Sequence, residues 1–82
     1  MQEASFNLYV PYKGEQREFQ AKLIVYGYAH KFHVDVDGVG ILFEPDEERQ
    51  YRAVLDNEAI EKNLNPNEEL TMLIRSRIAE LF

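Results

Sequence analysis

The residue types best suited to chemistry in this sequence are a histidine and an aspartate two positions apart. His33 and Asp35 belong to a stretch in which apolar and polar residues alternate, so on a β-strand their side chains lie on one face. Imidazole and carboxylate can transfer a proton or ligate a divalent cation. A metal site needs three or four converging ligands, and Lys22 is expected beside His33, where it disfavours a cation. We therefore predict two solvated polar residues.

The second histidine, His30, falls on the apolar side of its expected strand, near the end of the sheet and next to Val25. A histidine alone performs no nucleophilic chemistry. Ser5 is expected two strands away from His33, at about 10 Å, which is too far for a hydrogen bond. We therefore interpret His30 as a partly buried polar cap and predict no catalytic residue.

Two acidic segments resemble cation sites but are better explained as turns. Residues 35–38, Asp-Val-Asp-Gly, resemble part of an EF-hand calcium loop but lack the third ligand before the glycine. Glu44 and residues 46–48 form an acidic run, interpreted as a solvated hairpin tip, with a weak calcium site or a contact to a basic partner as the alternative. Residues 38–40 lack the strand and helix of a phosphate loop. The sequence thus predicts no metal, cofactor or cofactor-binding residue.

Length, charge and composition restrict the function further. The 82 residues form one domain over 1–82, because a second would be too short to bury its own core. The hydrophobic content of 45% argues against disorder, and the chain has no cysteine for disulfides or thiolate metal sites. A net charge of −6 disfavours binding to nucleic acid. Without a secretory signal, or an apolar run near the roughly 18 residues that span a bilayer, we expect a cytoplasmic protein without membrane contact.

Most of the chain alternates between apolar and polar residues with a period of two, which is typical of half-buried strands. Five strands are expected, at about 3–11, 17–26, 29–36, 39–44 and 50–55. The segments between the first four strands have the composition of two-residue hairpin turns, in which glycine accepts a positive φ: Lys13-Gly14, Gly27-Tyr28 and Asp37-Gly38. An acidic loop of three residues is expected before the last strand.

The turns and the alternation can be tested against each other, because a slip of one residue moves a whole strand to the wrong face. The two-residue turns predict three pairs: Tyr12 with Glu15, Tyr26 with Ala29, and Val36 with Val39. Counting outward from the turns gives rows that are apolar throughout: Ala4, Leu23, Phe32, Phe43 and Tyr51; Phe6, Ala21, Val34, Ile41 and Ala53; and Leu8, Phe19, Val36, Val39 and Leu55. This agreement predicts an antiparallel sheet with one apolar and one mainly polar face.

The last fifth of the chain changes to helical periodicity. Asn65 is expected as the N-cap of a helix over about 66–81, with Pro66 at its first position and Glu68 three residues after the cap. Its apolar stripe consists of Leu70, Leu73, Ile74, Ile78 and Leu81. Asp56 is a candidate cap for a short helical turn before it. The predicted fold is therefore α+β: a five-stranded antiparallel β-meander with one C-terminal α-helix packed on one face.

Several tyrosines and aliphatic residues are expected at or near the polar face of the sheet. Tyrosine is enriched in protein interfaces, because it offers a large contact area and a polar tip. If these residues cluster, they form an apolar patch for a partner; the alternative is ordinary scattered surface hydrophobes. The predicted interaction surface consists of Tyr9, Tyr12, Ile24, Tyr26, Tyr28, Leu42 and Val54.

Part of the sequence resembles a segment of short bacterial proteins of unknown function, chiefly from the Bacteroidetes lineage. The resemblance rests on residues 42–48, Leu-Phe-Glu-Pro-Asp-Glu-Glu, on residues 51–54, Tyr-Arg-Ala-Val, and on the hairpin that contains Val34-Asp35-Val36. With the downstream helix, it covers most of the chain. It implies a small bacterial domain and no particular activity or site residue.

These features favour a non-enzymatic protein-interaction module, whose partner is another protein or a second copy of the chain. The candidate surfaces are the outer face of the sheet, an exposed edge strand and the acidic hairpin. The alternative is a small-ligand binder or enzyme with a pocket between helix and sheet. That alternative requires a cavity of roughly 300 Å³ or more near His30 or Arg17.

Overall fold

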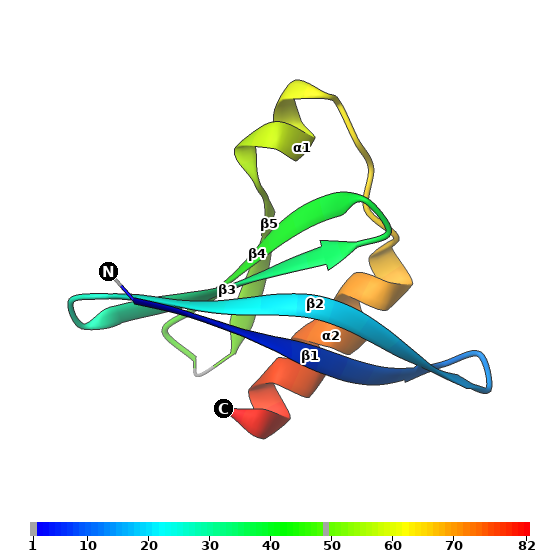
Figure 1. The fold of residues 1–82 in the computed structure, drawn as a ribbon, viewed down its shortest axis with the longest axis horizontal. Helices are drawn as coiled ribbons and strands as arrows, with labels where there is room; N and C mark the ends of the chain where they lie inside the picture. Colours follow the sequence, from blue (N-terminus) through cyan, green and yellow to red (C-terminus); the bar gives the residue numbers. More distant parts are fainter. Residues whose placement is uncertain (1, 49) are drawn as a thin grey trace.

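The computed structural model describes residues 2–48 and 50–82 and contains an open sheet of five antiparallel strands in the order β1-β2-β3-β4-β5. The elements are β1 (Gln2–Tyr12), β2 (Glu15–Tyr26), β3 (Ala29–Val36), β4 (Val39–Pro45), β5 (Tyr51–Leu55), α1 (Asn57–Glu61) and α2 (Glu68–Leu81). Helix α2 lies across one face of the sheet, and α1 stands at the end of the sheet beyond β4 and β5 (Figure 1). The predicted α+β meander with a C-terminal helix is confirmed.

The three two-residue turns are confirmed together with the register that they imply. The closing pairs are Tyr12 with Glu15, Tyr26 with Ala29, and Val36 with Val39. In the first turn, Lys13 and Gly14 both have positive φ values, 51° and 80°, which define the turn type whose twist matches that of the flanking strands. Turn chemistry and hydrophobic alternation therefore set the relative positions of β1 to β4.

The predicted register of β5 is wrong by two residues. Phe43 faces Ala53 and not Tyr51, which pairs with Pro45 instead, so the connection from Pro45 to Tyr51 is longer than the three-residue loop that was predicted. Asp46 explains this length, because its carboxylate accepts hydrogen bonds from the backbone N–H groups of Glu48 and Gln50, each at 2.9 Å. A shift of two residues preserves the alternation, so the faces of β5 remain as predicted.

The core lies between the apolar face of the sheet and α2. Its largest fully buried side chains are Phe32, Phe43, Leu8, Ile41, Leu70, Ile74, Ile78, Val10, Val34 and Val36. Two residues of the predicted apolar rows, Ala4 and Ala53, are exposed; both are small residues on edge strands. Burial of the large side chains is the main source of stability, at roughly 1.5–3 kcal/mol for each before the loss of chain entropy.

The N-cap of α2 differs from the prediction. Asn67, not Asn65, caps the helix, since its side-chain oxygen accepts a hydrogen bond from the N–H of Leu70 at 3.1 Å. Glu68 and Glu69 then occupy the first turn, where a negative charge stabilises the helix dipole. The buried stripe is narrower than expected, because Leu73 and Leu81 are 36% and 50% exposed.

The short helix α1 begins where Asp56 was a candidate cap: the Asp56 carboxylate accepts a hydrogen bond from the N–H of Ala59 at 2.8 Å. Ala59 is buried, and Leu64 packs against the same core. Both helices are too short or too polar to cross a membrane, within the part of the chain that the structure describes.

Candidate functional site

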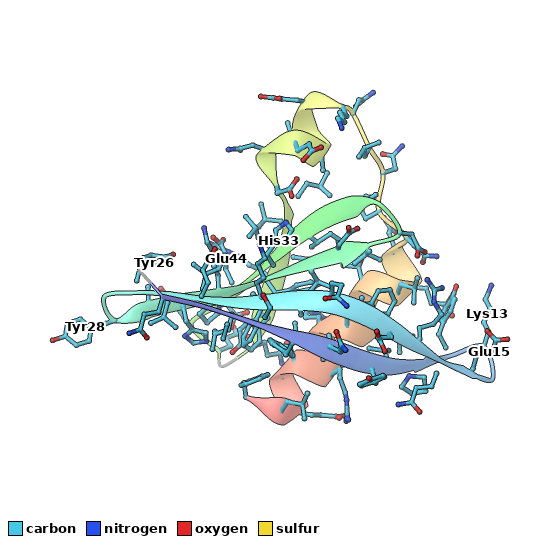
Figure 2. All side chains as sticks on the ribbon, viewed as in Figure 1. Lys13, Glu15, Tyr26, Tyr28, His33 and Glu44 are labelled. Atoms are coloured by element: carbon cyan, nitrogen blue, oxygen red, sulfur yellow. The ribbon has the colours of Figure 1, made fainter. Side chains whose placement is uncertain are left out.

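The structure disperses the residues of the predicted interaction surface. Tyr26 and Tyr28 lie at the end of the molecule formed by the β2–β3 turn, opposite the end that carries Lys13 and Glu15 (Figure 2). Tyr9 pairs with Glu18 on β2. Since Glu18 and Tyr26 are eight positions apart on one strand (26 − 18), roughly 26 Å separate the two tyrosines along the sheet.

The remaining members of that set also fall in separate places. Ile24 shares the outer face of β2 with Tyr26, and Leu42 pairs directly with Val54 on the outer face of β4 and β5. Tyr12 is half-buried and packs against the core on the opposite face. On the outer face, these residues therefore form two small separate groups, one at the β2–β3 end and one on β4 and β5, and Tyr9 stands alone. They do not form a single patch.

His33 forms its closest polar contact with Asp56, which the sequence indicated only as a helix cap. Its Nε2 lies 2.8 Å from the carboxylate of Asp56, the residue that caps α1. The hydrogen bonds from His33 and from the Ala59 N–H hold the pKa of Asp56 below its ordinary value. Asp35 instead accepts a hydrogen bond from the N–H of Gly38 and thus stabilises the β3–β4 turn. The expected position of Lys22 beside His33 is confirmed.

The contact between His33 and Asp56 depends on a glycine. A Cβ atom at Gly40 would collide with the Asp56 carboxylate and would lie 2.9 Å from His33 Nε2. A glycine inside a strand often marks such a close approach, so Gly40 was a usable signal for this contact. Over residues 2–48 and 50–82, no three His, Asp or Glu side chains converge as metal ligands. The contact joins His33 on β3 to the residue that caps α1, and thus forms a clasp between the sheet and this helix.

His30 is half-buried, and its Nε2 lies 3.0 Å from the hydroxyl of Tyr51, whose phenol pKa is raised by burial. His30 borders an open hollow of about 360 Å³ at the end of the apolar face. The hollow is lined mainly by apolar side chains: Leu23, Val25, Tyr28, Ala29, Phe32 and Phe82. This volume is within the range of small-ligand sites.

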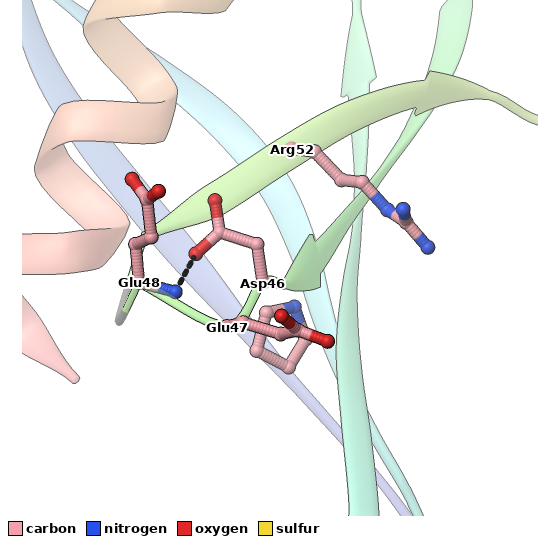
Figure 3. A pocket seen from close by; sticks show the side chains of 5 residues that line it. Asp46, Glu47, Glu48 and Arg52 are labelled. Carbon is pink, nitrogen blue, oxygen red and sulfur yellow. Dashed lines mark hydrogen bonds between the residues drawn. The ribbon is translucent and has the colours of Figure 1, made fainter.

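In the acidic loop between β4 and β5, the side chain of Asp46 accepts hydrogen bonds from the loop's own backbone. Figure 3 shows the Asp46 carboxylate turned toward the backbone of Glu48, while Glu47 points in another direction. Arg52 lies 3.4 Å from Glu44 on the neighbouring strand. The carboxylates of Asp46, Glu47 and Glu48 therefore do not converge on a common point, which fits the interpretation as a solvated hairpin tip.

The most unusual surface of the molecule is the free edge of β1. This strand has 11 residues and pairs with β2 alone within the described residues. The two-residue turn makes Tyr12 and Glu15 a hydrogen-bonded pair, and such pairs alternate along an antiparallel ladder. The backbone N–H and C=O groups of Glu3, Ser5, Asn7 and Tyr9 consequently point away from β2.

Pro11 supports this assignment independently. Proline has no N–H, so within a sheet it is found where that group would face away from the neighbouring strand. Pro11 belongs to the same alternate set as Tyr9 and pairs with Gln16 without needing its own N–H. The polar backbone groups of four other residues in this set, from Glu3 to Tyr9, form an unpaired ladder edge.

The side chains of β1 leave this edge open to another strand. Protein edges are ordinarily blunted by short length, charged residues, proline, bulges or a covering element, and the proline of β1, Pro11, lies next to the end of the strand. Residues 4–12 carry no charge at all, and no described loop donates a backbone hydrogen bond to the strand. Glu3 and Lys13 flank the uncharged run. β1 is thus long, uncharged from residue 4 to residue 12, and accessible, which makes it the best candidate functional site.

Comparison with known proteins identified no relative of this chain. No protein-family model matches the chain, and neither the curated proteins nor the solved structures gave a significant match. The resemblance of residues 42–54 to short Bacteroidetes proteins therefore stays a prediction. The function has to be argued from the edge of the sheet and from the hollow beside His30.

Proposed function

We propose that this chain is a non-enzymatic protein-interaction module, which adds a strand of its partner to the free edge of β1. The observation that carries the proposal is the length and uncharged character of that edge, 11 residues with no charge from 4 to 12. Strand addition uses the main chain for affinity and alternate side chains for specificity.

Four residues of the edge, Glu3, Ser5, Asn7 and Tyr9, offer unpaired backbone groups, and each hydrogen bond formed there contributes about 0.5–1.5 kcal/mol net. Phe6 and Leu8 lie on the apolar face and Ser5 and Asn7 on the polar face. A partner strand that alternates between apolar and polar residues therefore extends both faces of the sheet. Tyr9, from the predicted interaction surface, adds an exposed aromatic ring beside the edge.

A proline at Ser5 tests the proposal, because it removes an edge-facing N–H and leaves the β1–β2 ladder intact. Tagged wild-type chain, Ser5→Pro and the matched control Ser5→Ala are each used to capture proteins from native cytoplasm, with mass spectrometry as the readout. We expect a stoichiometric partner with the wild type and Ser5→Ala, and its loss with Ser5→Pro. Retention of the same partner by a folded Ser5→Pro chain would contradict strand addition at β1.

A second candidate function, small-ligand binding, is favoured by the hollow of about 360 Å³ beside His30. Apolar walls formed by Val25 and Phe32 can hold a flat apolar ligand, while the imidazole of His30, which also contacts Tyr51, supplies a polar group. A fragment library screened by two-dimensional NMR tests this function. We expect shifts confined to the hollow and absent in His30→Ala; a library without any such binder argues against it.

A further inference from the structure

Resting on the proposed function, we infer that the strand added to β1 is the β1 strand of a second copy of this chain. The two strands run antiparallel about a two-fold axis at Phe6, and the product is one continuous sheet of two protomers. Such an interface is isologous, so the same edge must complement itself. Three properties of β1 meet this requirement: its backbone groups, its side-chain rows and the apolar surface next to it.

The backbone groups match in this register. An axis at Phe6 places Ser5 opposite Asn7 and Glu3 opposite Tyr9 of the partner copy. These are the residues whose N–H and C=O groups point to the free edge, so they form hydrogen-bonded pairs with no group left over. Pro11, which cannot donate, lies outside the overlap. An axis at Asn7 would instead place Glu3 opposite Pro11. Because proline has no N–H, the carbonyl of Glu3 would then have no hydrogen-bond donor.

The side-chain rows also match, because the axis keeps the apolar face of both copies on one side. Phe6 meets Phe6, in the type of pair where side chains approach most closely, and Ala4 meets Leu8. On the polar face, Ser5 meets Asn7 and Glu3 meets Tyr9. The only charged residue within the overlap is Glu3, so no like charges oppose each other across the interface despite the net charge of −6 on each chain.

Exposed apolar surface lies next to the proposed axis. The ring of Phe82 packs against that of Phe6 with a centroid distance of 5.9 Å, yet Phe82 is still 62% exposed. Leu81 beside it is half-exposed. Figure 1 shows the C-terminal end of α2 reaching the free-edge side of β1. Pairing at Phe6 brings the two copies of this surface together and removes apolar area from water, which stabilises the dimer.

Sedimentation of the purified chain over a concentration series tests the dimer. We expect a species of twice the 9.7 kDa chain mass at micromolar concentration and amide protection at Ser5, Asn7 and Tyr9 that increases with concentration. The variants test whether the edge of β1 forms the interface. Ser5→Pro should raise the dissociation constant of the dimer by about 10- to 100-fold, because each of the two copies loses the hydrogen bond that the N–H of residue 5 donates. Ser5→Ala should change it by less than about threefold, since the lost hydroxyl makes no interfacial backbone bond. Circular dichroism confirms the fold of both variants.

Cross-linking tests the register without background, because the chain has no cysteine. An antiparallel hydrogen-bonded pair has a Cα separation of about 5.5 Å, which a disulfide can bridge. We expect Ser5→Cys chains to cross-link with Asn7→Cys chains, and neither variant to cross-link with itself. Rapid self-cross-linking of Asn7→Cys would overturn the axis at Phe6.

The two proposals fail in different ways. A wild-type chain that stays monomeric at millimolar concentration overturns the second copy as the partner. If Ser5→Pro nevertheless abolishes capture of a cytoplasmic protein, strand addition at β1 still stands. A dimer that the folded Ser5→Pro chain retains in full overturns both proposals, because its interface would not include the β1 edge.

Discussion

The two edge strands of this sheet differ in the ways that proteins use to prevent unwanted pairing. β5 has five residues, carries Arg52, and is followed at once by Asp56 and α1. The N–H of Asp56 donates to the carbonyl of Gly40 at 3.0 Å and continues the pairing inward, toward β4. β1 has 11 residues, no charge from 4 to 12, and no neighbour on its free side among the residues described. One edge is short, charged and tied down, while the other is long and open.

This difference indicates where the chain can interact. Short length and charge are general means of blunting an edge, and here they occur together at β5 alone. The clasp between His33 and Asp56 belongs to the β5 side, where it helps to hold that end of the sheet closed. The open edge offers the unpaired backbone groups of β1.

The largest effect is expected from breaking the closed side at Gly40. Gly40→Ala places a methyl group against the Asp56 carboxylate and His33 Nε2, so the clasp must open. We expect a loss of about 2–3 kcal/mol in the free energy of unfolding, measured by urea denaturation. Gly40→Ala combined with Asp56→Ala should cost less than the sum of the single changes, because the clash is relieved. If the loss in the double variant equals the sum of the losses in the two single variants, the proposed clash between residue 40 and Asp56 is wrong.

A smaller loss is expected from removing the Asp56 carboxylate alone. Asp56→Ala deletes the N-cap of α1 and the hydrogen bond to His33, which together should cost about 1–2 kcal/mol in urea denaturation. His33→Ala is the matched control, since it removes one contact and keeps the cap on Ala59. An equal loss in the two variants would mean that the cap contributes nothing.

The closed side should also respond to acid. The pKa of Asp56 is lowered in the folded state by the His33 hydrogen bond and the Ala59 N–H. Its stabilisation is therefore fully present above the unfolded value of about 3.9 and is lost as pH falls through the lower folded pKa. Asp56→Asn keeps a capping oxygen but does not titrate. We expect the stability difference between the wild type and Asp56→Asn to shrink below about pH 4; a constant difference down to pH 2 would argue against the linkage.

The smallest effect on folding is expected where the open edge is converted to resemble the closed one. Ser5→Glu places a charge on β1 directly opposite Lys22, so the free energy of unfolding of the monomer should change by no more than about 0.5 kcal/mol. Association through β1 should weaken nonetheless. Unfolding at low concentration and sedimentation at high concentration separate the two effects, and Ser5→Ala is the neutral control. If association is unchanged, the absence of charge on β1 is not what distinguishes its edge from that of β5.

Sequence reasoning succeeded where local geometry decides the structure. Two-residue turns and alternation predicted the pairs from Tyr12–Glu15 to Val36–Val39, because each depends on residues close in the chain. It failed at the β4–β5 loop, where the carboxylate of Asp46 closes a longer loop than composition indicates. The predicted faces of β5 are nevertheless correct, since a shift of two residues keeps every side chain on the same face of the sheet. The N-cap moved from Asn65 to Asn67 because three asparagines, at 63, 65 and 67, precede the helix and composition does not distinguish them.

The candidate sites depended on contacts that no spacing rule provides. His33 was interpreted with Asp35, two residues away, whereas it contacts Asp56, 23 residues away. The hollow beside His30 is lined partly by Phe82, which follows α2, and His30 itself contacts Tyr51 on β5. The predicted tyrosine surface included Tyr12, whose alternate position on β1 already placed it on the apolar face.

The sequence by itself determined the strands, their faces, most of their register and the presence of a covering helix. These features follow from the period of the apolar residues and from turn residues that tolerate positive φ, both of which are local properties of the chain. Only the tertiary structure decided which backbone edge is open, what His33 contacts and where a hollow forms. Those features depend on which distant segments come to lie side by side, and long-range packing, unlike turn geometry, is not encoded in any short stretch of residues.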